Sequence, residues 1–232
     1  MKSILKLEIL ECTFLKRLNR FVGLVDINGD IKKALITNTG RLEEFMIEGR
    51  RAFCIPKSGG KTEFVLLGFL EKNGRIAIID TRTQTKAFEK AIELGLISWL
   101  EGCSIKKKEV KIGNSRLDYI FKCPDTEIYA EMKSAVLRED NYAMYPDCPS
   151  ARGRKHIKEL IKLKEEGNKS MIFFIGALPG VEKFKPYEEG DAEIARLLRE
   201  AREKGVEIRA LSISMLQNGE IVLENDDLEV EV

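Results

Sequence analysis

Residues 115–134 read SRLDYIFKCPDTEIYAEMKS. Two short β-like runs, Leu117–Phe121 and Ile128–Met132, flank a segment that contains Pro, Asp and Thr, residue types that favour turns. Apolar runs of this length on both sides of a turn segment predict a β-hairpin. The hairpin lies near the middle of the chain, and the other informative motifs lie on both sides of it.

Successive side chains of a strand point to opposite faces of its sheet. The hairpin would therefore place Asp118, Glu131 and Lys133 on one face, and a two-residue loop at Asp125-Thr126 would set Asp118 opposite Lys133. Two carboxylates offer the hard oxygen ligands that Mg²⁺ or Mn²⁺ prefers, and the lysine could polarise a water or hold a phosphate. We therefore expect a catalytic site at these three residues, with Asp118 and Glu131 as metal ligands.

An aspartate followed on the next strand by Glu-x-Lys resembles the signature of the PD-(D/E)xK nuclease-like superfamily. Domains of this superfamily often add a carboxylate from a helix to the metal site. Glu89 is the candidate here, because it borders the apolar face of an expected helix. The alternative is an ordinary hairpin with a hydrated polar face, since Glu-x-Lys is a common spacing in a chain rich in Glu and Lys.

The composition indicates a globular protein of one large domain or two small ones: 232 residues, 44% hydrophobic and 33% charged. The net charge of +1 gives no global field for a polyanion, so a nucleic-acid surface would have to come from local clusters of basic residues. Charges interrupt the N-terminal apolar run, unlike a signal peptide, and no apolar run approaches the roughly 20 residues of a membrane helix. We expect no membrane partner.

The five cysteines are odd in number, none is spaced as Cys-x-x-Cys, and there is one histidine. This pattern favours neither a zinc finger nor a disulfide framework, so we expect reduced cysteines and a cytoplasmic location. Gly60-Lys61-Thr62 matches the end of a phosphate-binding P-loop, but Ile55 stands where the first glycine belongs and a strand-like run follows. We therefore expect no nucleotide cofactor.

The chain divides where its periodicity changes, near residue 84. Residues 1–83 hold short β-like runs and an Asn-Gly hairpin signal, which predict a small OB-like β-barrel. Residues 84–232 alternate helical and strand-like spacing, which predicts an α/β domain with a mixed sheet. The expected elements there include helices at 85–95, capped by Thr85, at 150–166 and at 191–204, and a buried strand at 169–176. The expected class is α+β, an OB-like barrel followed by a PD-(D/E)xK nuclease-like domain.

Further motifs accompany the hairpin: N-T-G at 38–40, S-R-L-D at 115–118, E-M-K-S at 131–134, and YPDCPSARGRKH at 145–156. In this order they resemble the sugar fermentation stimulation protein A family over nearly the whole chain. The chain departs from the family at Leu35-Ile36-Thr37, where His-Cys-Pro is usual, and at Tyr145, where Phe is usual. Neither departure touches the three charged residues of the hairpin.

The resemblance implies DNA binding and a regulatory role in carbohydrate metabolism. It leaves three functions open. The chain could be a DNA-binding protein with a nuclease-like Mg²⁺ site, an active Mg²⁺-dependent endonuclease or exonuclease, or a non-enzymatic interaction module with a relic nuclease fold. DNA is thus the expected partner, and the sequence indicates no oligomeric state.

Basic residues near these motifs are the candidate DNA contacts. They are Arg116, Arg152, Arg154, Lys155 and His156 in the second domain, and Arg41, Lys57 and Lys61 in the barrel. Arg152 and Lys155 follow the start of an expected helix, whose N-terminus favours phosphate, and OB barrels bind strands through basic grooves. The alternatives are a hydrated basic surface and, for His156, an ordinary packed residue.

Overall fold

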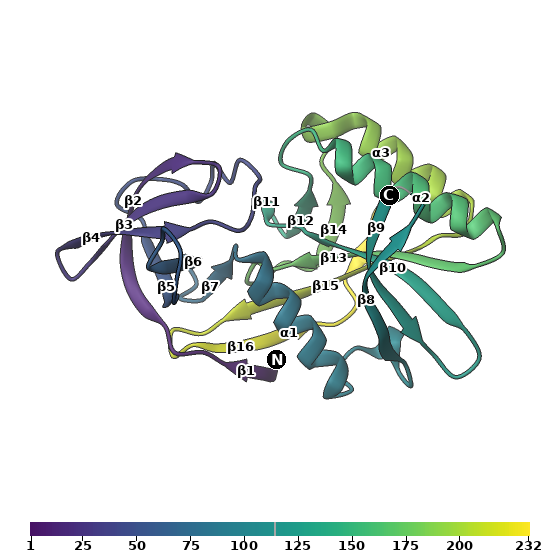
Figure 1. The fold of residues 1–232 in the computed structure, drawn as a ribbon, viewed down its shortest axis with the longest axis horizontal. Helices are drawn as coiled ribbons and strands as arrows, with labels where there is room; N and C mark the ends of the chain where they lie inside the picture. Colours follow the sequence, from purple (N-terminus) through teal and green to yellow (C-terminus); the bar gives the residue numbers. More distant parts are fainter. Residues whose placement is uncertain (114) are drawn as a thin grey trace.

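The computed structural model describes residues 1–113 and 115–232. The first part is a barrel of five strands, drawn in purple and blue in Figure 1: β2 (Leu10–Asn19), β3 (Val22–Ile27), β4 (Asp30–Leu35), β5 (Arg51–Pro56) and β6 (Phe64–Leu70). A parallel pairing of β4 with β6 closes the barrel. Phe14, Phe45 and Phe69 pack inside, with Phe69 5.6 Å from each of the other two ring centroids.

Two strands join the barrel to the rest of the molecule. β1 (Lys2–Lys6) precedes the barrel in sequence but pairs with β16 (Glu220–Asn225), beside which it lies in Figure 1. β7 (Ile76–Ile78) pairs with β6 on one side and with β15 (Glu207–Met215) on the other. One hydrogen-bonded sheet therefore runs from the barrel into the second domain. The division at residue 83 stays a prediction.

The second domain is built on a mixed sheet. Its order is β15-β13-β10-β9-β8, with β8 (Ser104–Ile112), β9 (Ser115–Lys122), β10 (Glu127–Ser134) and β13 (Lys169–Gly176). β13 runs parallel to both neighbours, and every residue after Lys169 in it is buried. A strand covered on both faces needs such a continuous apolar run, which confirms the strand predicted there.

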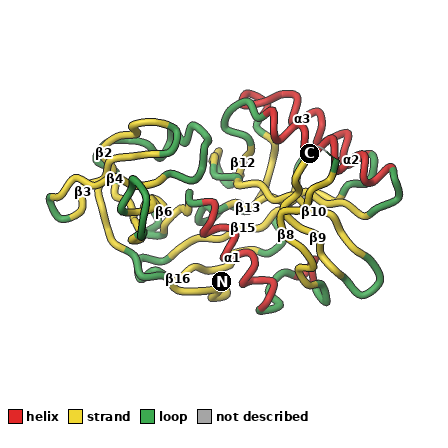
Figure 2. Tube along the Cα trace, viewed as in Figure 1, coloured by secondary structure: helices red, strands yellow, loops and turns green. Residues whose placement is uncertain are grey.

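Helices cover both faces of this sheet, as Figure 2 shows. α1 (Thr81–Glu93) packs on one face, where the ring centroids of Phe88 and Phe173 are 4.4 Å apart. α2 (Ala151–Glu165) and α3 (Glu188–Glu203) lie on the other. The remaining elements are a 3₁₀ turn (Ser98–Leu100) and a second sheet of β11 (Leu137–Glu139), β12 (Tyr142–Tyr145), β14 (Lys183–Pro186) and β17 (Glu229–Val230). The fold is the predicted α+β arrangement, an OB-like barrel followed by a mixed sheet with helices.

The helix starts differ in part from those expected. α2 starts where the sequence placed it, and Ser150 is its N-cap, because its side chain accepts a hydrogen bond from Gly153 N at 3.1 Å. α1 begins four residues before Thr85, since Asp80 accepts from Thr83 N at 2.8 Å and is the N-cap. Aspartate and serine are both strong caps, so sequence alone did not separate Asp80 from the threonines that follow it.

The register of the central hairpin also differs from the prediction. Glu127 pairs with Lys122 and Tyr129 with Ile120, so the loop holds four residues. Cys123 N donates to Thr126 O at 2.9 Å and closes this loop. The register therefore shifts by two residues along the strand from that of a two-residue loop. A shift of two keeps every side chain on its face, so Asp118, Glu131 and Lys133 still share one.

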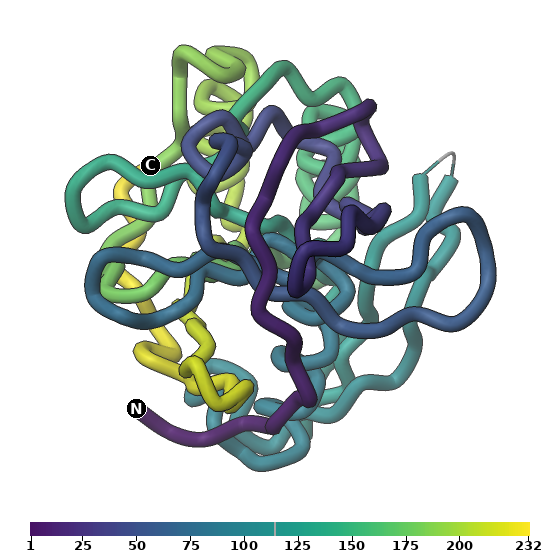
Figure 3. The backbone as a smooth tube through the Cα atoms, turned by 90° about the vertical axis from the view of Figure 1, so that its left-hand side faces the viewer, coloured from purple at the N-terminus to yellow at the C-terminus, as the bar shows by residue number. Residues whose placement is uncertain are grey.

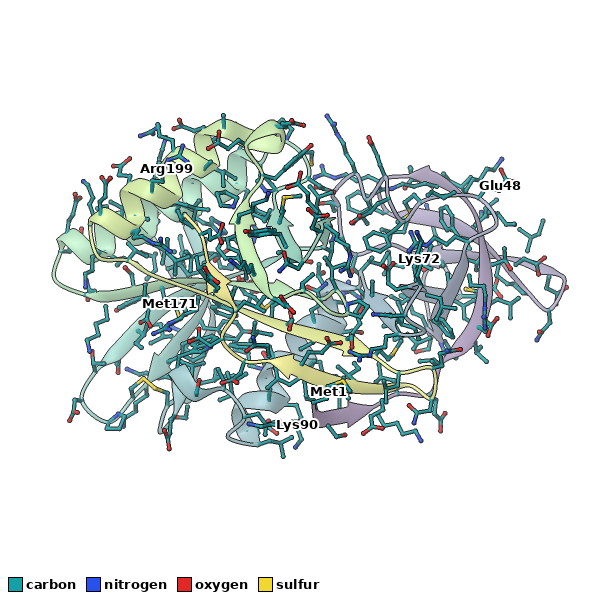
Figure 4. All side chains as sticks on the ribbon, turned by 180° about the vertical axis from the view of Figure 1, so that it is seen from behind. Met1, Glu48, Lys72, Lys90, Met171 and Arg199 are labelled. Atoms are coloured by element: carbon teal, nitrogen blue, oxygen red, sulfur yellow. A yellow bond between two sulfur atoms is a disulfide. The ribbon has the colours of Figure 1, made fainter. Side chains whose placement is uncertain are left out.

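The expectation of reduced cysteines is wrong for one pair. Cys103 and Cys123 form a disulfide, drawn as a yellow bond in Figure 4. Ser104 pairs with Lys122 across β8 and β9, and this register sets the two cysteines opposite each other. The disulfide removes the argument from reduced cysteines for a cytoplasmic location. It does not indicate another location either, because intracellular proteins of hyperthermophiles also carry disulfides. Within the described residues, no helix is long and apolar enough to span a membrane.

Candidate metal and nucleic-acid site

A hollow of about 310 Å³ lies where the barrel meets the second domain. Figure 3 looks at the molecule from the barrel side, with the barrel in front of the second domain. Asp118 of β9 and Glu131 and Lys133 of β10 line the hollow together. The other lining residues come from the barrel, α1, β10, β12 and the start of α2: Thr37, Asn38, Thr39, Thr81, Thr85, Met132, Ser134, Tyr145, Ser150, Arg152 and Gly153. The structure thus brings together the three predicted catalytic residues.

Glu131 is the most buried charged group of the hollow, with 1% of its surface exposed. Its Oε1 contacts both Lys133 Nζ and His156 Nδ1. Its Oε2 is buried and has no hydrogen-bond partner among the described residues. Burial opposes ionisation of this carboxyl, but the charge of Lys133 and the hydrogen bond from His156 outweigh burial and lower the Glu131 pKa.

The environment of Asp118 favours ionisation less than that of Glu131. Its Oδ2 accepts a hydrogen bond from Met132 N at 2.9 Å. Burial, followed by the charge of Glu131, raises the pKa of Asp118 to about 6. Burial lowers the pKa of the Lys133 ammonium, but the charge of Glu131, together with Tyr145, Asp118 and the hydrogen bond to Glu131, outweighs burial and raises it. The hollow therefore holds an ionised Glu131–Lys133 pair beside a carboxyl that lacks a cation of its own.

The oxygens of this hollow fit a hard divalent cation. Glu131 Oε2 has no partner, and Asp118 uses one oxygen for Met132 N, which leaves the other available. Among the described residues, no group of three or more His, Cys, Asp or Glu side chains could hold a metal. Mg²⁺ nevertheless binds commonly through one or two carboxylates while it keeps several waters. Two carboxylates are therefore sufficient for such an ion.

The structure does not bring Glu89 to this hollow. Its carboxylate contacts Lys108 Nζ at 2.7 Å and Tyr119 Oη at 3.2 Å. Tyr119 precedes Ile120 and follows Asp118 on β9, so it faces the side opposite to Asp118. Thr85, one helical turn earlier on α1, lines the hollow instead. The helix that was expected to add a carboxylate therefore presents a hydroxyl to the hollow.

The basic residues predicted on α2 have different environments. Arg152 is exposed and lines the hollow, with its Nε 3.4 Å from His156 Nε2. His156 is buried among the site residues and is not a surface group. Arg154 donates two hydrogen bonds to Asp191, at 2.8 and 3.0 Å. Lys155 is exposed. Arg152 and Lys155 are thus the accessible members of this group.

The other predicted DNA contacts lie farther along the chain. Arg116 is exposed on β9, 3.5 Å from Glu109. Arg41 is exposed and follows the Asn38–Gly40 segment. Lys57 and Lys61 belong to the loop between β5 and β6, where Lys57 Nζ donates to Gly59 O. These residues are available to solvent but do not line the hollow of Asp118 and Glu131.

Sequence reasoning missed several lining residues. Asn38 Nδ2 lies 3.5 Å from Ser134 Oγ and so connects the barrel to β10. Both residues belong to motifs that were noted in the sequence, N-T-G and E-M-K-S, but neither motif signalled its contact with the other. The contact joins residues 96 positions apart, so only the fold reveals it.

Comparison with known proteins identifies the family. A model of the sugar fermentation stimulation protein RE domain matches residues 82–219, and a model of the SfsA N-terminal OB domain matches residues 15–79. The chain belongs to the sugar fermentation stimulation protein family. This confirms the resemblance seen in the sequence motifs. The RE-domain match contains Asp118, Glu131 and Lys133, and the OB-domain match contains the Asn38–Gly40 segment.

Relatives and a solved structure extend this match over the whole chain. Sugar fermentation stimulation protein homologs of Pyrococcus furiosus and Archaeoglobus fulgidus are 62% and 43% identical, over 95% of this chain in both cases and 95% and 94% of their own. A solved structure is described as Pyrococcus furiosus SfsA in complex with Ca²⁺. It superposes with a TM-score of 0.97 at 59% identity and covers all of both chains. The arrangement of barrel and second domain is thus shared with a family member.

Proposed function

We propose that this protein binds DNA at the seam between its two domains, beside a divalent-cation site formed by Asp118 and Glu131. The observation that carries the proposal is the buried, unpartnered Oε2 of Glu131 in a hollow that Asp118 also lines. An unpartnered carboxylate oxygen in a buried site is costly. A hydrated Mg²⁺ or Mn²⁺ would satisfy it.

The solved relative supports the choice of a hard divalent ion, because its description names Ca²⁺. Ca²⁺, Mg²⁺ and Mn²⁺ all favour carboxylate oxygens. When bound, such an ion polarises a phosphate oxygen or lowers the pKa of a water. Glu131 holds its own ionised state through Lys133 and His156, so it remains a ligand near neutral pH.

DNA binding draws support from the exposed basic residues beside the hollow. Arg152 lines it at the first turn of α2, where free N–H groups and the helix dipole also favour phosphate. The overall charge of +1 makes this a local contact rather than a global attraction. A regulatory role in carbohydrate metabolism follows from the family name and is part of the proposal.

A second candidate function is metal-dependent cleavage of DNA. The observation in its favour is that Lys133 lines the same hollow as both carboxylates. Its ammonium would face a water or phosphate that enters the hollow. Two features weigh towards binding without robust cleavage. Lys133 already pairs with Glu131, and α1 presents Thr85 where a third carboxylate is usual.

Calorimetric titration with Mg²⁺ and Mn²⁺ tests the cation site. We expect one site in the wild type and loss of measurable heat in Asp118→Asn. Asp125→Asn is the matched control, because this exposed carboxylate sits in the loop of the same hairpin. Equal affinities in wild type and Asp118→Asn would remove Asp118 from the site.

Fluorescence anisotropy with labelled DNA tests the binding function. The logarithm of affinity should fall with the logarithm of salt by ~0.9 for each phosphate neutralised on duplex DNA. Arg152→Ala should weaken binding to all sequences and reduce this slope, whereas Arg199→Ala, an exposed arginine of α3 labelled in Figure 4, should leave it unchanged. An affinity that ignores salt would favour the third function, an interaction module without DNA.

Plasmid digestion over hours, with and without chelator, separates binding from cleavage. A nuclease should lose metal-dependent cleavage in Lys133→Ala and keep most of its DNA affinity, because a transition-state contact affects the chemical step far more than binding. A pure binding protein should cleave nothing even as wild type. Cleavage undiminished in Lys133→Ala would rule out a catalytic role for this lysine.

A further inference from the structure

Three hollows adjoin along the seam between the barrel and the second domain. The first is the hollow of Asp118 and Glu131. The second, a cavity of about 370 Å³, shares Ser134, Tyr145 and Arg152 with the first. The third opens on the barrel surface and shares Arg20 and Gly40 with the second. One residue, Thr39, lines all three. The hollows therefore adjoin one another in a row, called the path below, which runs from the barrel surface to the two carboxylates.

An arginine stands at each junction of this path. Arg152 borders the first and second hollows, Arg20 borders the second and third, and Arg41 lines the third. Arg51 and Arg154 show the contrast, because each has a carboxylate partner at 2.8 Å. Within the described residues, Arg20, Arg41 and Arg152 have no ion-pair partner. Arg20 Nε donates to Thr39 O at 3.3 Å and Arg152 Nε to His156 Nε2 at 3.4 Å, which leaves the terminal N–H groups of both side chains available to bind phosphates.

Hydrogen bonds hold the Asn38–Gly40 segment, which forms the wall of the path between Arg20 and Arg152, in place. Arg17 donates to Gly40 O at 2.7 Å and to Arg41 O at 2.8 Å, which ties the Asn38–Gly40 segment to β2. On the other side, Asp147 Oδ2 accepts from Leu42 N at 2.9 Å. Gly40 packs against the same carboxylate so closely that a Cβ would collide with it. The segment is thus held between both domains, and the path exists before any ligand arrives.

One carboxylate, Asp147, lies in the second hollow and would repel a phosphate. Its charge is offset locally, because Leu42 N–H points at it and the guanidinium of Arg17 is close enough to interact with it electrostatically. The net charge is therefore positive at both junctions of the path, where Arg152 and Arg20 lie.

We infer that this path binds a single strand of DNA and leads it from the barrel surface to Asp118 and Glu131, with phosphates at Arg20 and Arg152. The inference rests on the proposed DNA-binding function and specifies which form of DNA enters. A cavity of about 370 Å³ has the volume of a site for one small ligand. It accepts nucleotides one after another and excludes a base-paired duplex. The Asn38–Gly40 segment gains a role as the common wall of the path.

Anisotropy with three fluorescein-labelled probes tests the inference: an oligothymidylate, a blunt duplex closed by a hairpin, and the same duplex with a single-stranded tail. The wild type should bind the oligothymidylate and the tailed duplex more tightly than the closed duplex. Arg20→Ala should weaken single-strand binding by about fivefold or more through a lost phosphate contact. Thr39→Glu should weaken it by about tenfold or more, because its carboxylate faces phosphates along the path.

Arg51→Ala is the matched control, because Arg51 is an exposed arginine of the same barrel outside the path. Arg20 is exposed, so its removal does not threaten folding, and thermal melting checks both path variants. If wild type binds DNA in a salt-dependent manner but Arg20→Ala and Thr39→Glu bind the tail like wild type, the path is refuted and the proposed function stands. If wild type binds none of the probes, the proposed function fails and the path falls with it.

Discussion

Two buried carboxylates contact helix α2, and they differ in how many of their oxygens have partners. Asp191 accepts from Ser150 N at 2.8 Å, from Ile194 N at 3.4 Å and from Arg154 through both oxygens. Glu131 has two partners on Oε1, Lys133 and His156, and none on Oε2 among the described residues. The first carboxylate is complete without a ligand and holds the starts of α2 and α3 in place. Glu131 has a partner for its second oxygen only when a ligand binds in the hollow.

The comparison gives a way to separate structural acids from site acids without knowledge of the ligand. A buried carboxylate whose oxygens are all satisfied should cost stability when it is removed and leave binding unchanged. Removal of a buried carboxylate that has one oxygen without a partner should reduce ligand binding and change stability little. The substitutions below test this rule, in order of decreasing effect.

Asp191→Asn should lower the free energy of unfolding by about 3–5 kcal/mol, because it leaves Arg154 without its buried partner. Guanidinium denaturation measures the loss. Mg²⁺ affinity of the folded variant should stay at the wild-type value. Asp227→Asn is the control, since Asp227 pairs with Arg209 at the surface, where such pairs contribute little. Lost cation affinity in folded Asp191→Asn would break the distinction between the two carboxylates.

Removal of the disulfide separates stability from binding by another route. Cys103→Ala with Cys123→Ala opens a cross-link between residues 20 positions apart, and a loop of this length stabilises by about 3 kcal/mol. The double variant should have a lower melting temperature than wild type but the same Mg²⁺ affinity. If the double variant also loses Mg²⁺ affinity, then weaker Mg²⁺ binding in the other variants reflects their lower stability and not the loss of a metal-ligating side chain.

Glu44 sharpens the rule, because its Oε1 is also buried without a partner among the described residues. Burial, followed by the charge of Glu71, raises its pKa from 4.5 to about 7. The Glu44 carboxyl therefore binds a proton where Glu131 would bind a cation. Since the folded pKa is the higher one, the stabilisation is present below pH 4.5 and is lost as the pH rises towards 7.

Glu44→Gln mimics the protonated form at every pH. At pH 8 it should be more stable than wild type by about 1–3 kcal/mol, and at pH 4 the difference should vanish. Denaturation curves at both pH values measure this, with Glu43→Gln, an exposed neighbour, as the control. An equal effect at both pH values would mean that ionisation of Glu44 does not oppose folding.

The smallest effect is expected for Asp118→Asn in the absence of metal. The amide oxygen can still accept from Met132 N, and the substitution removes a negative charge beside Glu131. Stability should stay equal or rise by up to about 1 kcal/mol, while the cation site is lost. A clear loss of stability in the metal-free protein would place Asp118 with Asp191 as a structural acid.

Local patterns predicted much of the fold and the face of the site. The apolar run of β13 and the helical spacing of α2 depend on neighbouring residues, and strand alternation in the hairpin placed Asp118, Glu131 and Lys133 on one face. The contacts across the fold were not predictable in this way. His156 pairs with Glu131 across 25 positions, although the sequence grouped it with surface bases.

Two further errors share this cause. Glu89 lies on the correct helix, but only the packing of α1 shows that it faces Tyr119 and not Asp118. The partner of Cys123 depended on the register of β8 against β9, which the spacing of cysteines does not encode. In each case the missing information was which faces of distant elements meet.

During synthesis, β1 must wait for β16. Residues 2–6 leave the ribosome before the barrel strands and pair with residues 220–223, which leave after the barrel strands. The barrel strands between residues 10 and 70 find their partners within that segment and can pair as it emerges. We therefore expect β1 to remain unpaired beside a folded barrel until β16 is synthesised and pairs with it.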